Sequence, residues 1–218
     1  MTISDKLMYA ILAMDSYNRG TDSPDNRPGI NLIALGISQS NAGTATILQD
    51  KELPTGWETA GFYATAYTYN GKTIISYRGT EAGADYTKGW SASLGLATEF
   101  TQGDEALAFY KTVTCNEYWE GADSNTVLVG HSLGGGLAGL VGSLSGTNAY
   151  LFDYAPYSLA AELWRLFDGQ SSAPLSYTNI HSTWVENEIL QSARSGTLQV
   201  GVSEILSAAV KTFGFASV

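Results

Sequence analysis

The chain has 218 residues, of which 44% are hydrophobic and 15% are charged, and its formal net charge at pH 7 is −10. This length and composition are typical of one globular domain, so we expect residues 1–218 to form a single domain. The negative charge disfavours nucleic acids and anionic lipid surfaces as partners. The single cysteine, Cys115, excludes an internal disulfide.

The N-terminal stretch MTISDKLMYAILAMDSY is predicted to be a helix that packs on the surface of the domain. Its apolar residues at helical spacing are Ile3, Leu7, Ile11 and Met14, and Ser4 or Thr2 is the expected cap. The uncharged run is too short for a signal peptide, so export would need a route that uses no such peptide. No other stretch is long enough to span a membrane, and the compartment stays open.

A loop, a strand and a hairpin are expected next. Turn-forming residues predict the loop over Asn18–Gly29, and the apolar run NLIALGI (31–37) predicts the strand. Residues 61–80, GFYATAYTYNGKTIISYRGT, have aromatic and β-branched residues on both sides of Asn70-Gly71. That pair favours a two-residue type I′ turn, so this stretch predicts a β-hairpin.

Beyond residue 100 the pattern changes to helices that alternate with short buried strands. The expected helices cover residues 105–119, 133–144 and 158–167, and the expected strands cover 126–130, 148–156 and 175–185. Such alternation predicts an α/β fold, with a mainly parallel sheet and helices on both of its faces.

The stretch TVLVGHSLGGG (126–136) places Ser132 where a buried strand ends and a helix begins, with Gly130 and Gly134 two residues to either side. Such a turn holds a serine in a strained backbone conformation, and the two glycines let strand and helix approach each other. The helix N-terminus also suits a developing oxyanion. Ser132 is therefore the candidate nucleophile; a buried serine in a glycine-rich turn is the structural alternative. The glycines expected on one face of the helix are Gly135, Gly139, Gly142 and Gly146.

Two segments resemble known lipases. VLVGHSLGGGLAGLVG (127–142) resembles the nucleophile segment of α/β-hydrolase lipases, and TIISYRGT (73–80) resembles the strand and loop before the oxyanion hole of class 3 (fungal-type) lipases. The resemblance implies an α/β-hydrolase fold, hydrolysis of carboxylic esters, and Thr80 as an oxyanion residue. The N–H of Leu133, directly after the serine, is the expected second donor. Arg78 is expected to be structural and to pair with a loop carboxylate.

The acid of a Ser–acid–His triad is expected after the serine in this fold. Asp153 directly follows the apolar strand AYLF (149–152), and LFDYAP is similar to the acid site of pancreatic-type lipases. Class 3 lipases place the acid one strand later, where this chain offers Glu186 or Glu188. A carboxylate at a helix N-terminus is the structural alternative for either glutamate.

The base must be a histidine, and the chain has only His131 and His181. Because an elbow turns adjacent side chains in different directions, His131 is expected to pack beside the serine and not to act on it. His181 follows the acid in chain order, although class 3 lipases place their histidine nearer the C-terminus. Two alternatives follow: His181 is the base, or the chain is a segment of a longer hydrolase whose base lies beyond Val218.

Two functional hypotheses emerge from the sequence. The first is an esterase, lipase or phospholipase that acts on a small-molecule or lipid ester through an acyl-enzyme, without a metal or cofactor. The second is a non-catalytic module with the same fold. The apolar stretch WSASLGLATEF (90–100) is either part of a lid or an ordinary packed helix. Acyl-chain length and oligomeric state are left open.

Overall fold

The computed structural model describes residues 3–19, 45–48, 53–54, 61–79, 101–168 and 174–186, and the account below is confined to them. Their helices are α1 (Asp5–Asp15), α4 (Thr101–Thr114), α5 (Leu133–Ser145) and α6 (Ser158–Asp168), with 3-10 turns η1 (Ser16–Asn18) and η2 (Tyr118–Glu120). Their strands are β1 (Thr46–Ile47), β2 (Ala64–Tyr69), β3 (Lys72–Tyr77), β4 (Thr126–His131), β5 (Ala149–Phe152) and β6 (Ile180–Thr183).

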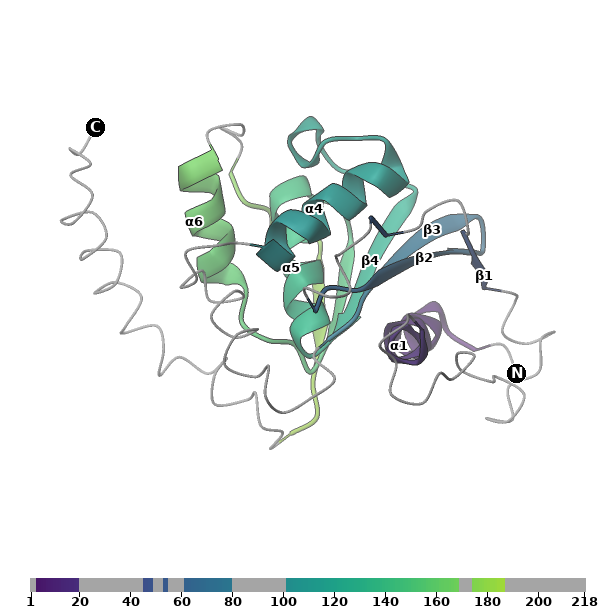
Figure 1. Cartoon of the computed structure of the whole chain (residues 1–218). Coiled ribbons are helices and arrows are strands. Elements are labelled where there is room, and N and C mark those ends of the chain that lie inside the picture. Colours follow the sequence, from purple (N-terminus) through teal and green to yellow (C-terminus); the bar gives the residue numbers. More distant parts are fainter. Residues whose placement is uncertain are drawn as a thin grey trace, which may run out of the picture.

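The six strands form one sheet in the order β1-β2-β3-β4-β5-β6. The first two pairings are antiparallel, and β3 to β6 run parallel to one another. In Figure 1, α1 lies on one side of the sheet, whereas α4, α5 and α6 lie on the other. The predicted α/β fold, mainly parallel and covered on both faces, is therefore confirmed.

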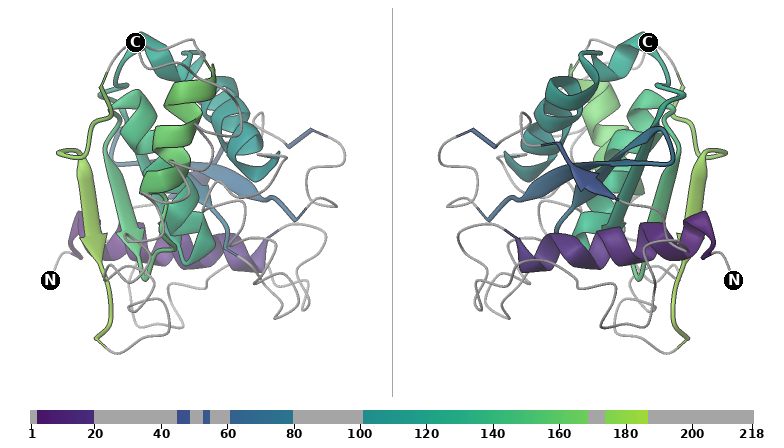
Figure 2. Two further views of the ribbon diagram at one scale, coloured as in Figure 1. Left: turned by 90° about the vertical axis from the view of Figure 1, so that its left-hand side faces the viewer. Right: turned by 90° about the vertical axis from the view of Figure 1, so that its right-hand side faces the viewer.

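Apolar clusters fill both interfaces between the sheet and the helices. On the side of α4, α5 and α6 the buried strand residues include Ile75, Tyr77, Leu128 and Leu151. On the side of α1 they include Ile74, Val127 and Val129. Alternate residues of β3 and β4 thus point to opposite faces, so these strands are buried on both sides. Figure 2 shows α1 running across the strands on its face of the sheet.

The hairpin formed by β2 and β3 has the predicted turn. Tyr69 and Lys72 are paired, and the two residues between them have positive φ, 49° at Asn70 and 74° at Gly71. Both angles are those of a type I′ turn, which asparagine and glycine adopt more readily than other residues. The hairpin delivers β3 to the side of β4, where the candidate nucleophile follows.

Helix α1 starts as predicted, but only part of the expected face is buried. The Ser4 hydroxyl accepts a hydrogen bond from the N–H of Leu7 at 3.3 Å and caps the helix. Ile3 and Ile11 pack against the cluster on this side of the sheet as expected, whereas Leu7 and Met14 are exposed and Met8 and Leu12 are buried in their place. The prediction was wrong for Leu7 and Met14 because two apolar stripes lie side by side on this helix, and periodicity does not rank them. Contact with β3 and β4 selects the second stripe.

Several expectations fall outside the described residues: the strand over 31–37, most of the loop over 18–29, Thr80, Glu188, and the stretch 90–100. In the described ranges, no helix combines the length and apolar character that crossing a membrane requires.

Candidate functional site

Ser132 lies on a sharp connection between β4 and α5, at the carboxyl end of the parallel strands. Its φ of 55° and ψ of −125° are outside the regions that most non-glycine residues occupy. Its side chain is half-buried, so it is within reach of solvent. The strand–turn–helix connection expected from the sequence is present, and it holds Ser132 in the strained backbone conformation that a nucleophile elbow requires.

The glycines two residues from Ser132 are needed for the turn to close. A Cβ on Gly130 would lie 2.1 Å from the carbonyl oxygen of Gly134. A Cβ on Gly134 would lie 2.0 Å from the carbonyl oxygen of Tyr77, at the end of β3. Since both neighbours are backbone atoms, neither clash can be relieved by a rotamer change. The motif therefore packs the start of α5 directly against β3 and β4.

Three of the four glycines that the sequence placed on one face of the helix also mark close contacts. A Cβ would lie 2.7 Å from Tyr154 at Gly135, 2.5 Å from the Tyr157 ring at Gly139, and 2.9 Å from Ala149 at Gly142. The fourth, Gly146, has a different role from the expected one. Its φ of 77° makes it the left-handed C-cap, and its N–H donates to the carbonyl oxygen of Gly142.

The candidate oxyanion donors come from the ends of two adjacent strands. Leu133 is the first residue of α5, so its N–H has no acceptor within the helix. Thr80 is outside the described residues, but the chain leading to it is placed, because Tyr77 pairs with Gly130. The strand that leads to Thr80 therefore runs beside the strand that leads to Ser132.

Arg78, at the end of β3, is 6% exposed. Its Nη1 donates to the carbonyl oxygen of Arg19 at 3.1 Å, and its guanidinium lies over the Tyr63 ring, 4.7 Å from the centroid. These contacts hold the guanidinium against a carbonyl oxygen and an aromatic ring, as a structural arginine would be held. The expected pairing with a loop carboxylate stays a prediction.

Asp153 lies beside the candidate nucleophile. His131 and Phe152 are aligned across β4 and β5, so Ser132 and Asp153 are each the next residue beyond that pair. The Ser132 N–H donates to the carbonyl oxygen of Phe152 at 3.0 Å. Asp153 has a φ of 41°, and its Oδ1 accepts a hydrogen bond from the N–H of Val185 at 2.7 Å. A second strained residue thus stands next to the first, with its carboxylate fixed. Glu186, the alternative acid, is exposed.

The structure does not bring His181 to Ser132. His181 is aligned with Tyr150, which is aligned with Val129, three residues before Ser132. At about 3.3 Å per residue and about 4.8 Å per strand, His181 lies roughly 10 Å back along the strands and two strands away. Its ring stacks on Tyr150, with centroids 4.6 Å apart, on the α1 side of the sheet. Reaching Ser132 would require β6 to rearrange.

His131 is the histidine adjacent to Ser132 in the chain, and its ring contacts Tyr17. Its Nδ1 lies 3.0 Å from the Tyr17 hydroxyl, and the two rings meet edge to face with centroids 5.8 Å apart. Burial lowers the pKa of His131 below its usual value, and the charge of Asp153 opposes this shift. In the described part of the chain, neither imidazole hydrogen-bonds to the Ser132 hydroxyl.

Tyr17 is the residue of this site that sequence reasoning missed. It follows α1, more than a hundred residues from the nucleophile, and it belongs to no motif. A tyrosine at the end of an amphipathic helix is more often a packing residue, so the sequence carries no signal that singles it out.

The described ranges hold no group of three or more His, Cys, Asp or Glu side chains that could bind a metal ion.

A mainly parallel sheet with a strained serine between strand and helix is the architecture of an α/β hydrolase. A family model described as Phospholipase-like, Tle-like phospholipase domain, matches residues 8–209. The chain belongs to this family of Tle-like phospholipase domains. No curated protein matches the chain. The family supports a hydrolase of the lipase and phospholipase type, and it does not single out the class 3 lipases that two sequence segments resemble.

Proposed function

We propose that this domain hydrolyses carboxylic ester bonds in lipids, phospholipids among them, with Ser132 as nucleophile. The observation that carries the proposal is the strained backbone of Ser132 (φ 55°) between β4 and α5, in a chain of a phospholipase family. Attack by the serine on the ester carbonyl forms an acyl-enzyme and releases the alcohol, and water then releases the acid. The mechanism uses no metal or cofactor.

The negative charge that develops on the carbonyl oxygen is stabilised by two donors. The Leu133 N–H stands at the N-terminus of α5, whose dipole favours an anion, and Thr80 supplies the second donor from the end of β3. This pair requires the ends of β3 and β4 to keep a fixed separation, which the close contact of Gly134 with Tyr77 supports.

Asp153 is the proposed acid. Its carboxylate lies one residue beyond the aligned pair His131 and Phe152, and one of its oxygens already accepts a backbone hydrogen bond. Its second oxygen is then available to orient an imidazole, which is the role of the acid in a serine triad. Glu186 and Glu188 are the alternatives from the sequence.

The general base is the member of the triad that the described arrangement lacks. His181 as base stays a prediction from chain order, and its place on the α1 side of the sheet argues against it. We therefore propose that the imidazole comes from outside these 218 residues, from a further part of the protein or from a partner. Without it, Ser132 has no proton acceptor, and the domain by itself is a hydrolase-fold module with little activity.

The test is made on the natural full-length protein with a short-chain p-nitrophenyl ester and with phospholipid vesicles. Ser132→Ala should lower ester hydrolysis by several orders of magnitude, since only binding and oxyanion effects are left. A fluorophosphonate should label Ser132. Ser182→Ala, which alters an exposed serine of β6, is the matched control and should keep full activity. Hydrolysis that survives Ser132→Ala, or a label on another serine, would contradict the proposal.

Ester hydrolysis by the isolated 218-residue chain distinguishes the two hypotheses about the general base. If the imidazole comes from outside, this chain should fold but hydrolyse esters only slowly, and added imidazole should increase its rate. If His181 is the base, the chain should be as active as the full-length protein.

A further inference from the structure

The hydroxyl of Tyr17 lies between the ends of the two strands that carry the proposed reaction. It is 3.0 Å from Nδ1 of His131 and 3.3 Å from the carbonyl oxygen of the same residue, directly before Ser132. On its other side is Gly79, where an added Cβ would lie 2.1 Å from the hydroxyl oxygen. One oxygen atom therefore touches the residue before the nucleophile and the residue before Thr80.

The hydrogen bonds of this hydroxyl restrict the His131 ring. Two of the acceptors near the Tyr17 hydroxyl belong to His131, its carbonyl oxygen and its Nδ1. If Nδ1 accepts the hydroxyl proton, the ring is neutral and carries its hydrogen on Nε2; if the proton goes to the carbonyl, Nδ1 carries a hydrogen and donates to the hydroxyl. The lowered pKa of His131 favours the neutral ring in either arrangement.

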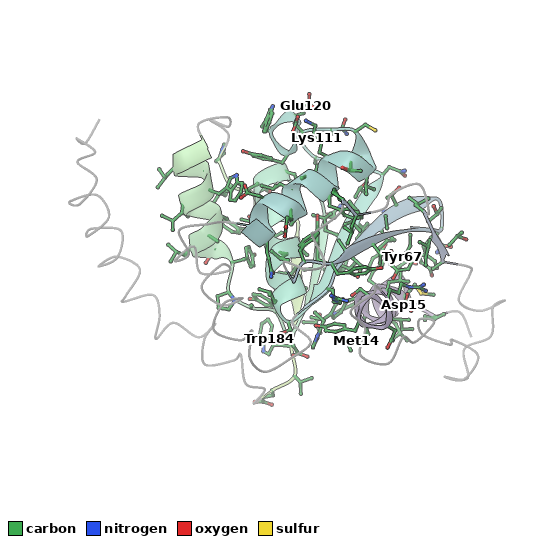
Figure 3. The ribbon with its side chains drawn as sticks, in the orientation of Figure 1. Met14, Asp15, Tyr67, Lys111, Glu120 and Trp184 are labelled. Carbon is green, nitrogen blue, oxygen red and sulfur yellow. The ribbon has the colours of Figure 1, made fainter. Side chains whose placement is uncertain are left out.

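Buried polar contacts fix the segment that carries Tyr17. Asp15, which is 4% exposed, accepts hydrogen bonds from the Tyr67 hydroxyl at 2.7 Å and from Nε of Arg19 at 2.5 Å. Figure 3 labels Asp15 and Tyr67 where α1 meets the sheet. Arg78, the residue before Gly79, donates to the carbonyl oxygen of Arg19. The chain on both sides of Tyr17 is thus tied to β2 and β3.

We propose that Tyr17 is a positioning residue, whose hydroxyl sets the distance between Ser132 and the end of the chain that follows β3, at Gly79, by lying against both His131 and Gly79. The inference rests on the proposed function, because it assigns Tyr17 a part in the same site. Tyr17 does not touch the reacting atoms. It acts through His131 and Gly79, so its loss changes the alignment of Ser132 with the segment that ends at Gly79.

The kinetic test compares Tyr17→Phe with Tyr9→Phe in the natural full-length protein. Both are tyrosines of the same N-terminal segment, but Tyr9 packs on Tyr150, with ring centroids 4.8 Å apart, away from the elbow. A small misplacement of reacting groups lowers the rate of the chemical step by up to about 100-fold. Tyr17→Phe should therefore lower kcat by about 10- to 100-fold, with KM little changed. Tyr9→Phe should keep kcat. An unchanged kcat in Tyr17→Phe, with Ser132-dependent activity present, would overturn the proposal.

A second test needs no activity. With only two histidines in the chain, nitrogen NMR resolves each imidazole, and His181→Asn assigns them. In the wild-type protein, His131 should show a hydrogen-bonded Nδ1, one dominant tautomer and a pKa below the usual 6.5. Tyr17→Phe should remove the Nδ1 hydrogen bond and mix the tautomers, whereas Tyr9→Phe should not. A wild-type His131 ring whose Nδ1 shows no hydrogen bond would refute the bridge even if Tyr17→Phe failed to fold.

Replacement of His131 supplies a rescue. His131→Asn keeps a polar atom near the position of Nδ1, so this variant should retain most of the wild-type kcat. His131→Leu removes that polar atom, so its kcat should fall as much as that of Tyr17→Phe. The double variant Tyr17→Phe, His131→Leu should be no worse than either single one, because the two residues act as a unit. If the wild-type protein hydrolyses no ester at all, the proposed function fails, and the NMR result alone decides whether Tyr17 holds His131.

Discussion

The elbow around Ser132 and the last described strand, β6, differ in how firmly their surroundings hold them. Ser132 lies between a strand buried on both faces and a closely packed helix. A Cβ would lie 2.0 Å from a backbone oxygen at Gly134 of the helix and 2.1 Å from one at Gly130 of the strand. β6 has four residues, and its partner on one side is β5. Its His181 is exposed, and Trp184 and Val185 just beyond it are 52% and 65% exposed.

The contrast shows that the candidate nucleophile and a candidate base are positioned by different parts of the chain. The position of Ser132 follows from local backbone geometry, since strand, turn and helix are contiguous in sequence. A base has to arrive from a distant segment, and its place depends on the register and length of a strand near the edge of the sheet. In this chain the strand, turn and helix around Ser132 are all present, whereas the distant strand β6 places His181 against Tyr150 and away from Ser132.

The largest effect is expected from disturbing the elbow itself. Gly134→Ala would place a Cβ 2.0 Å from the Tyr77 carbonyl oxygen, and this backbone contact cannot yield without moving α5 from β3. We expect loss of folded protein, measured by circular dichroism and thermal unfolding. Gly71→Ala is the control, because a Cβ there meets nothing within 4 Å and only its positive φ of 74° is strained. Equal stability of the two variants would show that the elbow is less constrained than its geometry indicates.

Thr80→Val should have the next largest effect. If the hydroxyl stabilises the oxyanion, kcat should fall by about 100-fold or less, with KM little changed and the fold intact. Because valine keeps the N–H, a small loss would assign the stabilisation to the backbone. Steady-state kinetics of the full-length protein give both constants. A changed KM with constant kcat would instead place Thr80 in the substrate pocket.

The pH dependence of stability probes the elbow through His131. Its pKa in the folded protein is below the unfolded value of about 6.5, so the folded state favours the neutral ring. The unfolded state then binds more protons between the two pKa values. The stabilisation is full above about pH 6.5 and is lost as pH falls through the folded pKa. Thermal unfolding at a series of pH values should show this decrease, and His131→Asn should reduce it. An identical pH profile for the variant would contradict the assignment.

Glu105 on α4 should show the opposite pH dependence. Burial, with a further contribution from Asp104, raises its pKa to about 7, and its Oε2 is buried without a hydrogen-bond partner in the described structure. The protonated form therefore stabilises the fold at low pH, and this contribution is lost as pH rises from about 4.5 through about 7. Glu105→Gln should raise the melting temperature above pH 7 relative to wild type. Glu162→Gln, at a more exposed ion-paired glutamate, is the control and should not.

The smallest effect is expected at β6. His181→Ala removes a ring that stacks on Tyr150, so it should leave kcat for esters nearly unchanged in the full-length protein. A loss as large as that of Ser132→Ala would instead establish His181 as the base, because members of a triad act as a unit. In that case β6 and the chain after it would have to move during catalysis.

Much of the framework around Ser132 was predictable because it is encoded by neighbours in sequence. The Asn70-Gly71 pair indicates its turn through the φ values that each residue tolerates. The apolar run before Ser132 and the glycines after it indicate strand and helix. This pattern matches the observed β4 and α5 because steric constraints between neighbouring residues do not depend on distant parts of the chain.

The buried face of α1, the place of His181 and the contacts of Tyr17 were decided by tertiary structure. The sequence of α1 contains two adjacent apolar stripes that its periodicity does not distinguish, and contact with β3 and β4 decides which side chains are buried. Chain order permits His181 to be a base, but the pairing of β6 with β5 sets how far along the sheet it lies. Tyr17 reaches His131 from the end of α1, where the buried Asp15 accepts a hydrogen bond from Tyr67 of β2. The sequence by itself thus determined the backbone of the candidate nucleophile, a local property, while long-range packing decided which side chains surround it.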